Sequence, residues 1–167
     1  MFRPALLALA IAALSAPALA SDYKLGAITI QNPWTRPAMA GMNGVGFLAI
    51  ANTGSKPVKI MGAQSPAAGK IEIHRSAMAN GVMTMRRQDD GVVVPAGGTL
   101  ALAPGGYHLM LLALNRPLVA GQKIPVTLIF ESGRRIAIDL TVQTAAPQSA
   151  AAAKSGKAAD GAHHHHP

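Results

Sequence analysis

Turn-forming residues interrupt this chain so often that little besides short strands fits between them. Between Leu25 and Val142, groups of glycine, proline and asparagine recur about every ten residues. The clearest groups are Asn52-Thr53-Gly54, Asn80-Gly81, Pro95-Ala96-Gly97-Gly98, Pro104-Gly105-Gly106 and Ser132-Gly133. They follow one another too closely to leave a convincing helix in this part of the chain.

The intervals between the turns show the two-residue period of strands. In Lys70–Arg75, Ile71 and Ile73 alternate with polar residues and are expected to face the core. We predict nine strands: Ala27–Gln31, Gly46–Ala51, Val58–Ala63, Lys70–Arg75, Val82–Arg87, Thr99–Ala103, His108–Ala113, Ile124–Glu131 and Arg135–Gln143. This spacing is typical of an all-β fold, and we predict one antiparallel Greek-key sandwich or barrel over residues 21–143.

The first twenty residues have the pattern of a cleaved export signal. Arg3 gives a basic start, Ala5–Ala13 is apolar, and Ala18-Leu19-Ala20 is a small-x-small cleavage sequence. The apolar run is shorter than the roughly 20 residues that span a bilayer as a helix. We therefore predict that residues 1–20 are removed, that the mature chain begins at Ser21, and that no stable membrane insertion remains.

The composition excludes several classes of function. The chain has no cysteine, which rules out zinc ribbons, iron–sulfur clusters, a nucleophilic thiol and the His₂Cys set of electron-transfer cupredoxins. Its formal charge of +8 becomes +7 without Arg3, but the cations are scattered and only 4% of residues are aromatic. We expect no nucleic-acid partner. We also find no carboxylate pair, activated nucleophile or phosphate loop, and predict that the protein is not an enzyme.

The C-terminal segment differs in composition from the rest. After Thr144 the chain is dominated by Ala, Ser, Lys, Gly and Gln, and we predict a disordered tail over residues 144–167. It ends in His163, His164, His165 and His166, followed by Pro167. These histidines are either an added tag or a native metal-binding tract.

Two short segments carry candidate metal ligands. In His108-Leu109-Met110, the imidazole and the thioether are two residues apart, so on a strand they share one face about 6.6 Å apart. The second segment pairs His74 with Met83 or Met85 across an expected hairpin of Lys70–Arg75 and Val82–Arg87. Met83 and Met85 share a face, so parity does not choose between them. Each segment alone is also compatible with core packing.

Taken together, the two segments indicate a soft metal site. His74 and His108 are the only histidines outside the tail, and each has a methionine within reach on a strand. Two imidazoles and two thioethers form a neutral ligand set without thiolate, which suits copper(I) better than zinc or magnesium. Such a site is expected to bind and release its ion. Glu72 shares a face with His74, but we predict that it is a solvated surface charge.

These residues resemble the periplasmic copper(I) chaperones of the PCuAC family, which have a cupredoxin-like β-sandwich. The resemblance covers about Asp22 to Val142. It is carried by Asn32-Pro33-Trp34-Thr35-Arg36, Ile71-Glu72-Ile73-His74, Val82-Met83-Thr84-Met85-Arg86, Pro95-Ala96-Gly97-Gly98, Pro104-Gly105-Gly106-Tyr107-His108-Leu109-Met110 and Val126-Thr127-Leu128-Ile129-Phe130.

The family motif is a His, ten residues, a Met, about twenty-one residues and His-x-Met. Here ten residues separate His74 from Met85, and twenty-two separate Met85 from His108. A loop over residues 88–98 can absorb the extra residue. Residue 75 is Arg, where some relatives have a further methionine. The resemblance implies one copper(I) ion held by His74, Met85, His108 and Met110.

The resemblance also implies a role and a location. A monomeric periplasmic chaperone would hand copper(I) by ligand exchange to the copper-site subunit of cytochrome c oxidase or to another copper assembly protein. Some relatives hold copper(II) on a C-terminal extension, and His163–His166 is a candidate for a minimal version of it. The alternative is an exported structural or assembly β-sandwich with no physiological metal.

Four other residues have weaker expectations. Met39 and Met42 lie in a Pro/Gly/Asn-rich loop and are expected to be exposed or to pack locally, with a role near the site less favoured. Met61 alternates with Ile60 and is predicted to lie in the core. Trp34 is the only tryptophan and is predicted to anchor the sandwich.

Overall fold

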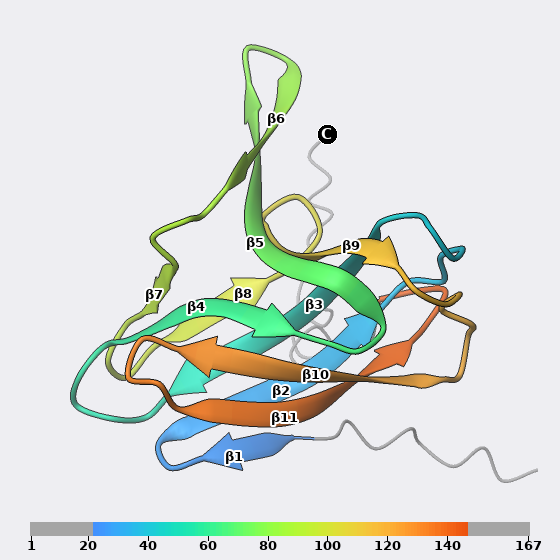
Figure 1. Cartoon of the computed structure of the whole chain (residues 1–167). Coiled ribbons are helices and arrows are strands. Elements are labelled where there is room, and N and C mark those ends of the chain that lie inside the picture. The colour runs from blue at the N-terminus through green and yellow to red at the C-terminus, as the bar shows by residue number, and fades with distance from the viewer. Residues whose placement is uncertain (1–21, 147–167) are drawn as a thin grey trace, which may run out of the picture.

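The computed structural model describes residues 22–146, and all regular structure in this part is β-strand (Figure 1). The predicted export segment, residues 1–20, and the histidines at 163–166 lie outside the described residues. The strands are β1 (Tyr23–Leu25), β2 (Ile28–Thr35), β3 (Gly44–Asn52), β4 (Val58–Gln64), β5 (Ala68–Ala79), β6 (Val82–Arg87), β7 (Val92–Val94), β8 (Thr99–Leu102), β9 (Tyr107–Leu114), β10 (Lys123–Phe130) and β11 (Arg135–Val142). In this range, no helix is long and apolar enough to cross a membrane.

The strands close into a barrel, which confirms the predicted all-β fold. Neighbouring strands pair in the order β5-β9-β8-β3-β2-β11-β10-β4, and β4 returns to β5 through the pair Ala63 and Ile71. Most pairs are antiparallel, whereas β2–β11 and β8–β9 are parallel. β1 pairs with β2, β7 with β4, and β6 with β5.

The barrel interior is filled by alternate residues of the strands. Ile71 and Ile73 of β5 and Leu109 and Leu111 of β9 are at most 6% exposed, so the predicted inward face of Lys70–Arg75 is confirmed. The residues between them on these two strands face outward. The two predicted histidines therefore project from the outer surface of the barrel wall.

The strands β1 and β7 and the side chain of Met61 differ from the sequence-based prediction. β1 and β7 were not predicted, because each is three residues long and too short to show alternation. Met61, predicted to lie in the core, is 39% exposed because Ile60 and Ala63, on either side of it, take the inward positions. The register with β10 shifts here: Ile60 and Gly62 are opposite the consecutive residues Phe130 and Ile129, so Met61 is the extra residue of a β-bulge.

The β5–β6 hairpin extends beyond the barrel (Figure 1). β5 has twelve residues, and only its first part pairs with β9. β6 pairs with the last six residues of β5, 74–79, of which His74 and Arg75 also pair with β9, and all six residues of β6 are exposed. The two-residue turn Asn80-Gly81 has positive φ at both positions, 50° and 77°, as a tight hairpin requires, and it fixes the register.

Candidate metal centre

Strand pairing places the two predicted histidines directly opposite each other. His74 of β5 is the register partner of His108 of β9, and their ring centroids are 5.9 Å apart. Directly opposite residues of an antiparallel pair share a face, so both rings lie on the outer side of the sheet. His108 is nevertheless only 4% exposed. The arrangement brings together two imidazoles that are 34 positions apart in the sequence.

Each ring has one nitrogen held by a hydrogen bond and one buried nitrogen that lacks a partner. His74 Nε2 lies 2.8 Å from Glu72 Oε2, and His108 Nδ1 lies 3.1 Å from the carbonyl oxygen of Gly106. A carboxylate and a carbonyl only accept, so these two nitrogens carry the hydrogens. In the described part of the chain, His74 Nδ1 and His108 Nε2 are buried without a hydrogen-bond partner. In the neutral rings both have a free lone pair.

Glu72 is the carboxylate that orients His74, and its prediction as a solvated surface charge is wrong. Its side chain is only 12% exposed and also contacts Lys70 Nζ at 2.7 Å and Arg87 Nη1 at 2.9 Å. The hydrogen bonds from Lys70, then His74 and then Arg87 lower the pKa of Glu72 to about 2. A carboxylate behind a metal-binding histidine fixes the tautomer and the orientation of the ring.

The Glu72 cluster predicts a pH-dependent contribution to stability. The pKa of Glu72 is about 2 in the fold against 4.5 for the free group, so the contribution is complete above pH 4.5 and is lost as the pH falls through about 2. We expect Glu72→Gln to cost on the order of 1 kcal/mol at pH 7, because Lys70 and Arg87 are largely solvated. Thermal unfolding of both proteins from pH 7 to pH 2 checks this. A difference in melting temperature that stays constant to pH 2 would contradict it.

The candidate methionines lie on the same outer face as the histidines. Met110 follows His108 by two residues and is the register partner of Glu72. Met85 is opposite Ser76, one same-face step from His74 along β5, whereas Met83 is opposite Met78, two steps away. The register therefore places Met85 nearer to the histidines than Met83. Both are exposed, at 49% and 57%, so neither packs in the core.

A β-bulge directs Trp34 to this face and not to the barrel interior. The register between β2 and β3 shifts between Gln31 and Trp34, and Asn32 has a φ of 48°. The shift reverses the alternation that buries Ile30 in the core. Trp34 then lies opposite Phe47 with ring centroids 4.7 Å apart, and both are 5% exposed. Trp34 is thus buried as predicted, but as part of an outer aromatic pair.

This aromatic pair lies beside the histidines. Val45, two residues before Phe47, is the register partner of Met110. Phe47 therefore continues along the same face in the direction of His108. Arg36 covers both rings, with its guanidinium carbon 5.9 Å from each centroid. An apolar wall of this kind helps to keep water from the buried nitrogen of His108.

The loop methionines lie away from the histidines. Met39 and Met42 are 72% and 61% exposed, and their loop is hydrogen-bonded to the far end of β9 through Leu114. Leu114 is six residues from His108, which corresponds to about 20 Å along a strand. The expectation that these methionines are exposed is confirmed, and a shielding role is not supported.

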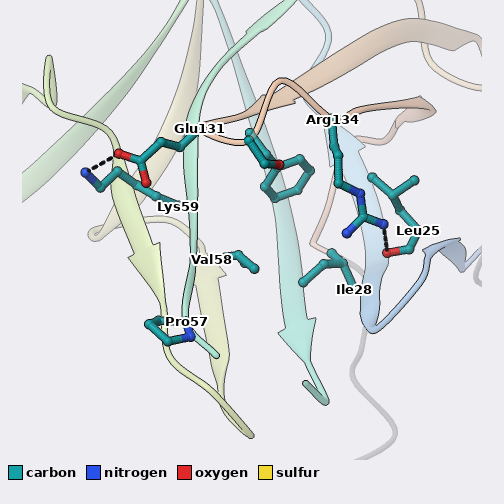
Figure 2. Close-up of a pocket in the computed structure, with 9 residues that line it drawn as sticks. Leu25, Ile28, Pro57, Val58, Lys59, Glu131 and Arg134 are labelled. Atoms are coloured by element: carbon teal, nitrogen blue, oxygen red, sulfur yellow. Dashed lines mark hydrogen bonds and ion pairs between the residues drawn. The ribbon is translucent and has the colours of Figure 1, made fainter. Parts of the chain in front are cut away.

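A separate hollow of about 120 Å³ shares no residue with this site (Figure 2). Its wall is mainly apolar, and its charged side chains already have partners. Lys59 pairs with Glu131 at 3.0 Å, and Arg134 donates to the carbonyl oxygen of Leu25 at 2.8 Å. Within the described chain, the hollow is lined by no histidine or methionine. Among residues 22–146 no group of three or more His, Cys, Asp or Glu side chains is placed to hold one.

Sequence comparison relates this chain to proteins named as putative lipoproteins. A family model described as "Putative lipoprotein LpqE-like" matches residues 28–142. "Putative lipoprotein Lxx21020" of Leifsonia xyli subsp. xyli is 43% identical over 106 residues, covering 64% of this chain and 63% of that protein. "Uncharacterized protein RP573" of Rickettsia prowazekii is 25% identical over 120 residues, covering 70% and 66%. The chain thus spans just under two thirds of the length of these relatives.

Comparison of the fold identifies PCuAC domains. The apo PCuAC domain from PmoF1 has a TM-score of 0.63 and 26% identity, covering 75% of this chain and all of that domain. The copper-bound PCuAC domain from PmoF2 has a TM-score of 0.62 and 23% identity, with 75% and 99% coverage. Apo-DR1885 from Deinococcus radiodurans has a TM-score of 0.56 and 24% identity, with 87% and 97% coverage. The barrel thus has the cupredoxin-like fold of these domains.

Proposed function

This chain belongs to the LpqE-like family through residues 28–142, and we propose that it is an exported copper(I) carrier with a single site on the outer wall of its barrel. The site consists of His74, Met85, His108 and Met110. Its function is to bind the ion and release it to another protein, with no catalytic step of its own. The fold shared with the copper-bound PCuAC domain from PmoF2 supports this proposal.

The observation that carries the proposal is the pair of buried imidazole nitrogens without partners. Leaving a buried polar atom unsatisfied costs about 1–3 kcal/mol, and two such atoms on facing rings are uncommon without a reason. His74 Nδ1 and His108 Nε2 have free lone pairs because Glu72 and Gly106 occupy the other nitrogens. One metal ion bound between the rings would satisfy both atoms.

The surrounding donors favour copper(I) over other ions. Met110 and Met85 add thioether sulfur on the same face, and thioethers select soft ions. The four ligands are neutral, so a monovalent ion leaves a net charge of only +1 beside the Trp34–Phe47 wall. The lack of a third His, Cys, Asp or Glu around the two rings in residues 22–146 argues against a zinc site.

We propose ligand exchange as the mechanism of transfer. Met85 is half exposed and lies on the projecting strand β6, so a partner can replace it first. The recipient we propose is the copper-site subunit of cytochrome c oxidase or one of its assembly proteins. Such a transfer requires the periplasm, to which the predicted signal in residues 1–20 would send the chain. His163–His166 are proposed to bind copper(II), and this is independent of the barrel site.

A methionine series tests the barrel site. Met110→Leu and Met85→Leu conserve side-chain volume and remove one thioether each, so we expect each to weaken copper(I) binding about tenfold with an unchanged fold. Met83→Leu is the matched control, because Met83 lies one step farther along the same strand, and it should leave the affinity unchanged. Competition titration against a chromogenic copper(I) chelator measures the three affinities.

Each outcome of the series is informative. Unchanged affinity in Met110→Leu would count heavily against the proposed ligand set. A loss in Met83→Leu but not in Met85→Leu would assign the hairpin ligand to Met83. If the unmodified chain binds no copper(I), the alternative of a structural or assembly sandwich without metal is favoured.

A further inference from the structure

The outer end of the β5–β6 hairpin carries apolar side chains that no packing in the structure explains. Met78 and Met83 are 64% and 57% exposed, and β6 pairs with no described strand other than β5. A methionine stabilises a fold when its side chain is buried, so these exposed methionines contribute little to the stability of the barrel. The strand pairing of the hairpin determines which face they occupy.

The register places these two thioethers face to face. Met78 and Met83 are direct partners across the β5–β6 ladder, and Met85 is two residues from Met83 on the same face. Side chains of directly opposite residues start from Cβ atoms about 4.5–5.5 Å apart. Methionine has three rotatable bonds beyond the backbone, so both sulfur atoms can converge on one small ion.

The other face of the hairpin has a different chemistry. Arg75 and Arg86 are direct partners there, and Arg75 covers the ring of Tyr107 at 5.3 Å. Arg75 and Arg86 thus point away from Met78 and Met83, whereas Arg87, two residues beyond Met85 on the thioether face, is paired with Glu72. The outer end of this face, from Ser76 and Met85 to Met78 and Met83, carries no charged side chain, and thioether donors select a soft ion.

The thioether face is continuous with the central site. From the tip of the hairpin toward the barrel, the face presents Met78 opposite Met83, then Ser76 opposite Met85, then His74 opposite Arg87 and His108. Each step along a strand is about 6.6 Å, which is within reach of two flexible side chains that exchange one ion. Met85 lies between the outer pair and the histidines.

We propose that Met78 and Met83 form an auxiliary copper(I) site, the first point of contact for an ion that enters or leaves the central site. The auxiliary pair binds the ion weakly through two thioethers, and Met85 then passes it to His74 and His108. The proposal rests on the proposed function of the central site. It adds a second binding position outside the four central ligands. This position would affect how fast copper(I) enters and leaves the central site.

The auxiliary pair should affect rates and leave the final affinity unchanged. Transfer between neighbouring sites on one molecule is intramolecular and benefits from a high effective concentration. We expect Met78→Leu/Met83→Leu to slow copper(I) uptake from a copper(I)–chelator complex on the order of tenfold. The equilibrium affinity of the central site should stay within about threefold, because its four ligands are intact.

The matched control is Met39→Leu/Met42→Leu. It removes two thioethers of similar exposure, 72% and 61%, from the loop before β3. Stopped-flow uptake by the full chain should be as fast in this control as in the unmodified protein. Equal uptake rates in the Met78→Leu/Met83→Leu variant and in this control would overturn the proposal.

Silver(I) detects the auxiliary pair directly, because it is a soft monovalent ion that does not change oxidation state. In the full chain labelled with ¹³C at the methionine methyl groups, we expect the first silver(I) to shift the signals of Met85 and Met110. Further silver(I) should shift those of Met78 and Met83. Signals of Met78 and Met83 that stay unchanged in excess silver(I) would refute the auxiliary site.

The same measurement separates this proposal from the central one. In His108→Ala the central site is disrupted while the hairpin is intact, and the shifts of Met78 and Met83 should persist. If the central site does not exist, silver(I) leaves the signal of Met110 unchanged in the unmodified chain, whatever the hairpin does. If only the auxiliary site fails, Met110 responds and Met78 and Met83 do not.

Discussion

Replacing His108 with alanine is expected to weaken copper(I) binding by at least about 100-fold. Loss of residues that merely orient metal ligands typically costs 10–100-fold, so loss of a ligand itself should cost no less. His108 is the most buried of the proposed ligands, at 4% exposed, and supplies one of the two unpartnered nitrogens. Competition titration of the full chain with a copper(I) chelator measures the change.

The His108→Ala variant should remain folded, because the side chain projects from the outer face of the sheet. Within residues 22–146 its imidazole makes one hydrogen bond, from Nδ1 to the carbonyl oxygen of Gly106, which also accepts from the backbone N–H of Ser76 at 3.0 Å. Circular dichroism and the melting temperature check the fold. Glu72→Gln keeps both histidine ligands and should therefore reduce the copper(I) affinity less than His108→Ala does. A folded His108→Ala protein with undiminished affinity would show that this imidazole is not a ligand.

Leu109→Ala is expected to destabilise the barrel by about 2–5 kcal/mol, the range for a large-to-small substitution in a packed core. Leu109 is 0% exposed, pairs with Ile73, and lies so close to Gly46 that a Cβ there would be 3.3 Å from its own Cβ. For a domain of this size the melting temperature should fall by roughly 10–20 °C. Thermal and urea unfolding of the apo protein measure the loss.

The matched control for this substitution is Leu112→Ala on the same strand. Leu112 faces outward as the partner of Lys70, so its loss should cost less than about 1 kcal/mol. The comparison also tests the register of β9. A slip of one residue would exchange the two faces and direct His108 and Met110 inward. If Leu112→Ala were the more costly change, both the register and the metal site would be contradicted.

Most of the fold could be predicted from local patterns, whereas its closure could not. Lys70–Arg75 revealed its inward face because Ile71 and Ile73 alternate with polar residues. β7 did not, since Val92–Val94 is too short to show a period and forms only by pairing with β4. The pair Ala63–Ile71 that closes the barrel depends on the placement of two strands, and no local signal reports it.

In the candidate site, too, local spacing could be predicted, whereas contacts between distant strands could not. The i, i+2 spacing of His108 and Met110 predicted a shared face, which the structure has. Glu72 was placed on the correct face, but its burial results from the approach of Arg87 from the neighbouring strand. Trp34 was predicted to anchor the sandwich, but the sequence did not indicate on which face, because the bulge at Asn32 that turns it outward interrupts the alternation.

The projecting hairpin divides the molecule into two parts with different local stability. Among the described strands β6 pairs only with β5, so it can unfold locally while the barrel stays intact. His74, His108 and Met110 lie on strands that separate only when the barrel itself unfolds. Local opening of β6 would withdraw Met85 and leave three donors in place. Retention of the ion would then depend on the free energy of unfolding of the whole barrel. Its release would depend on the much smaller free energy needed to open β6 alone.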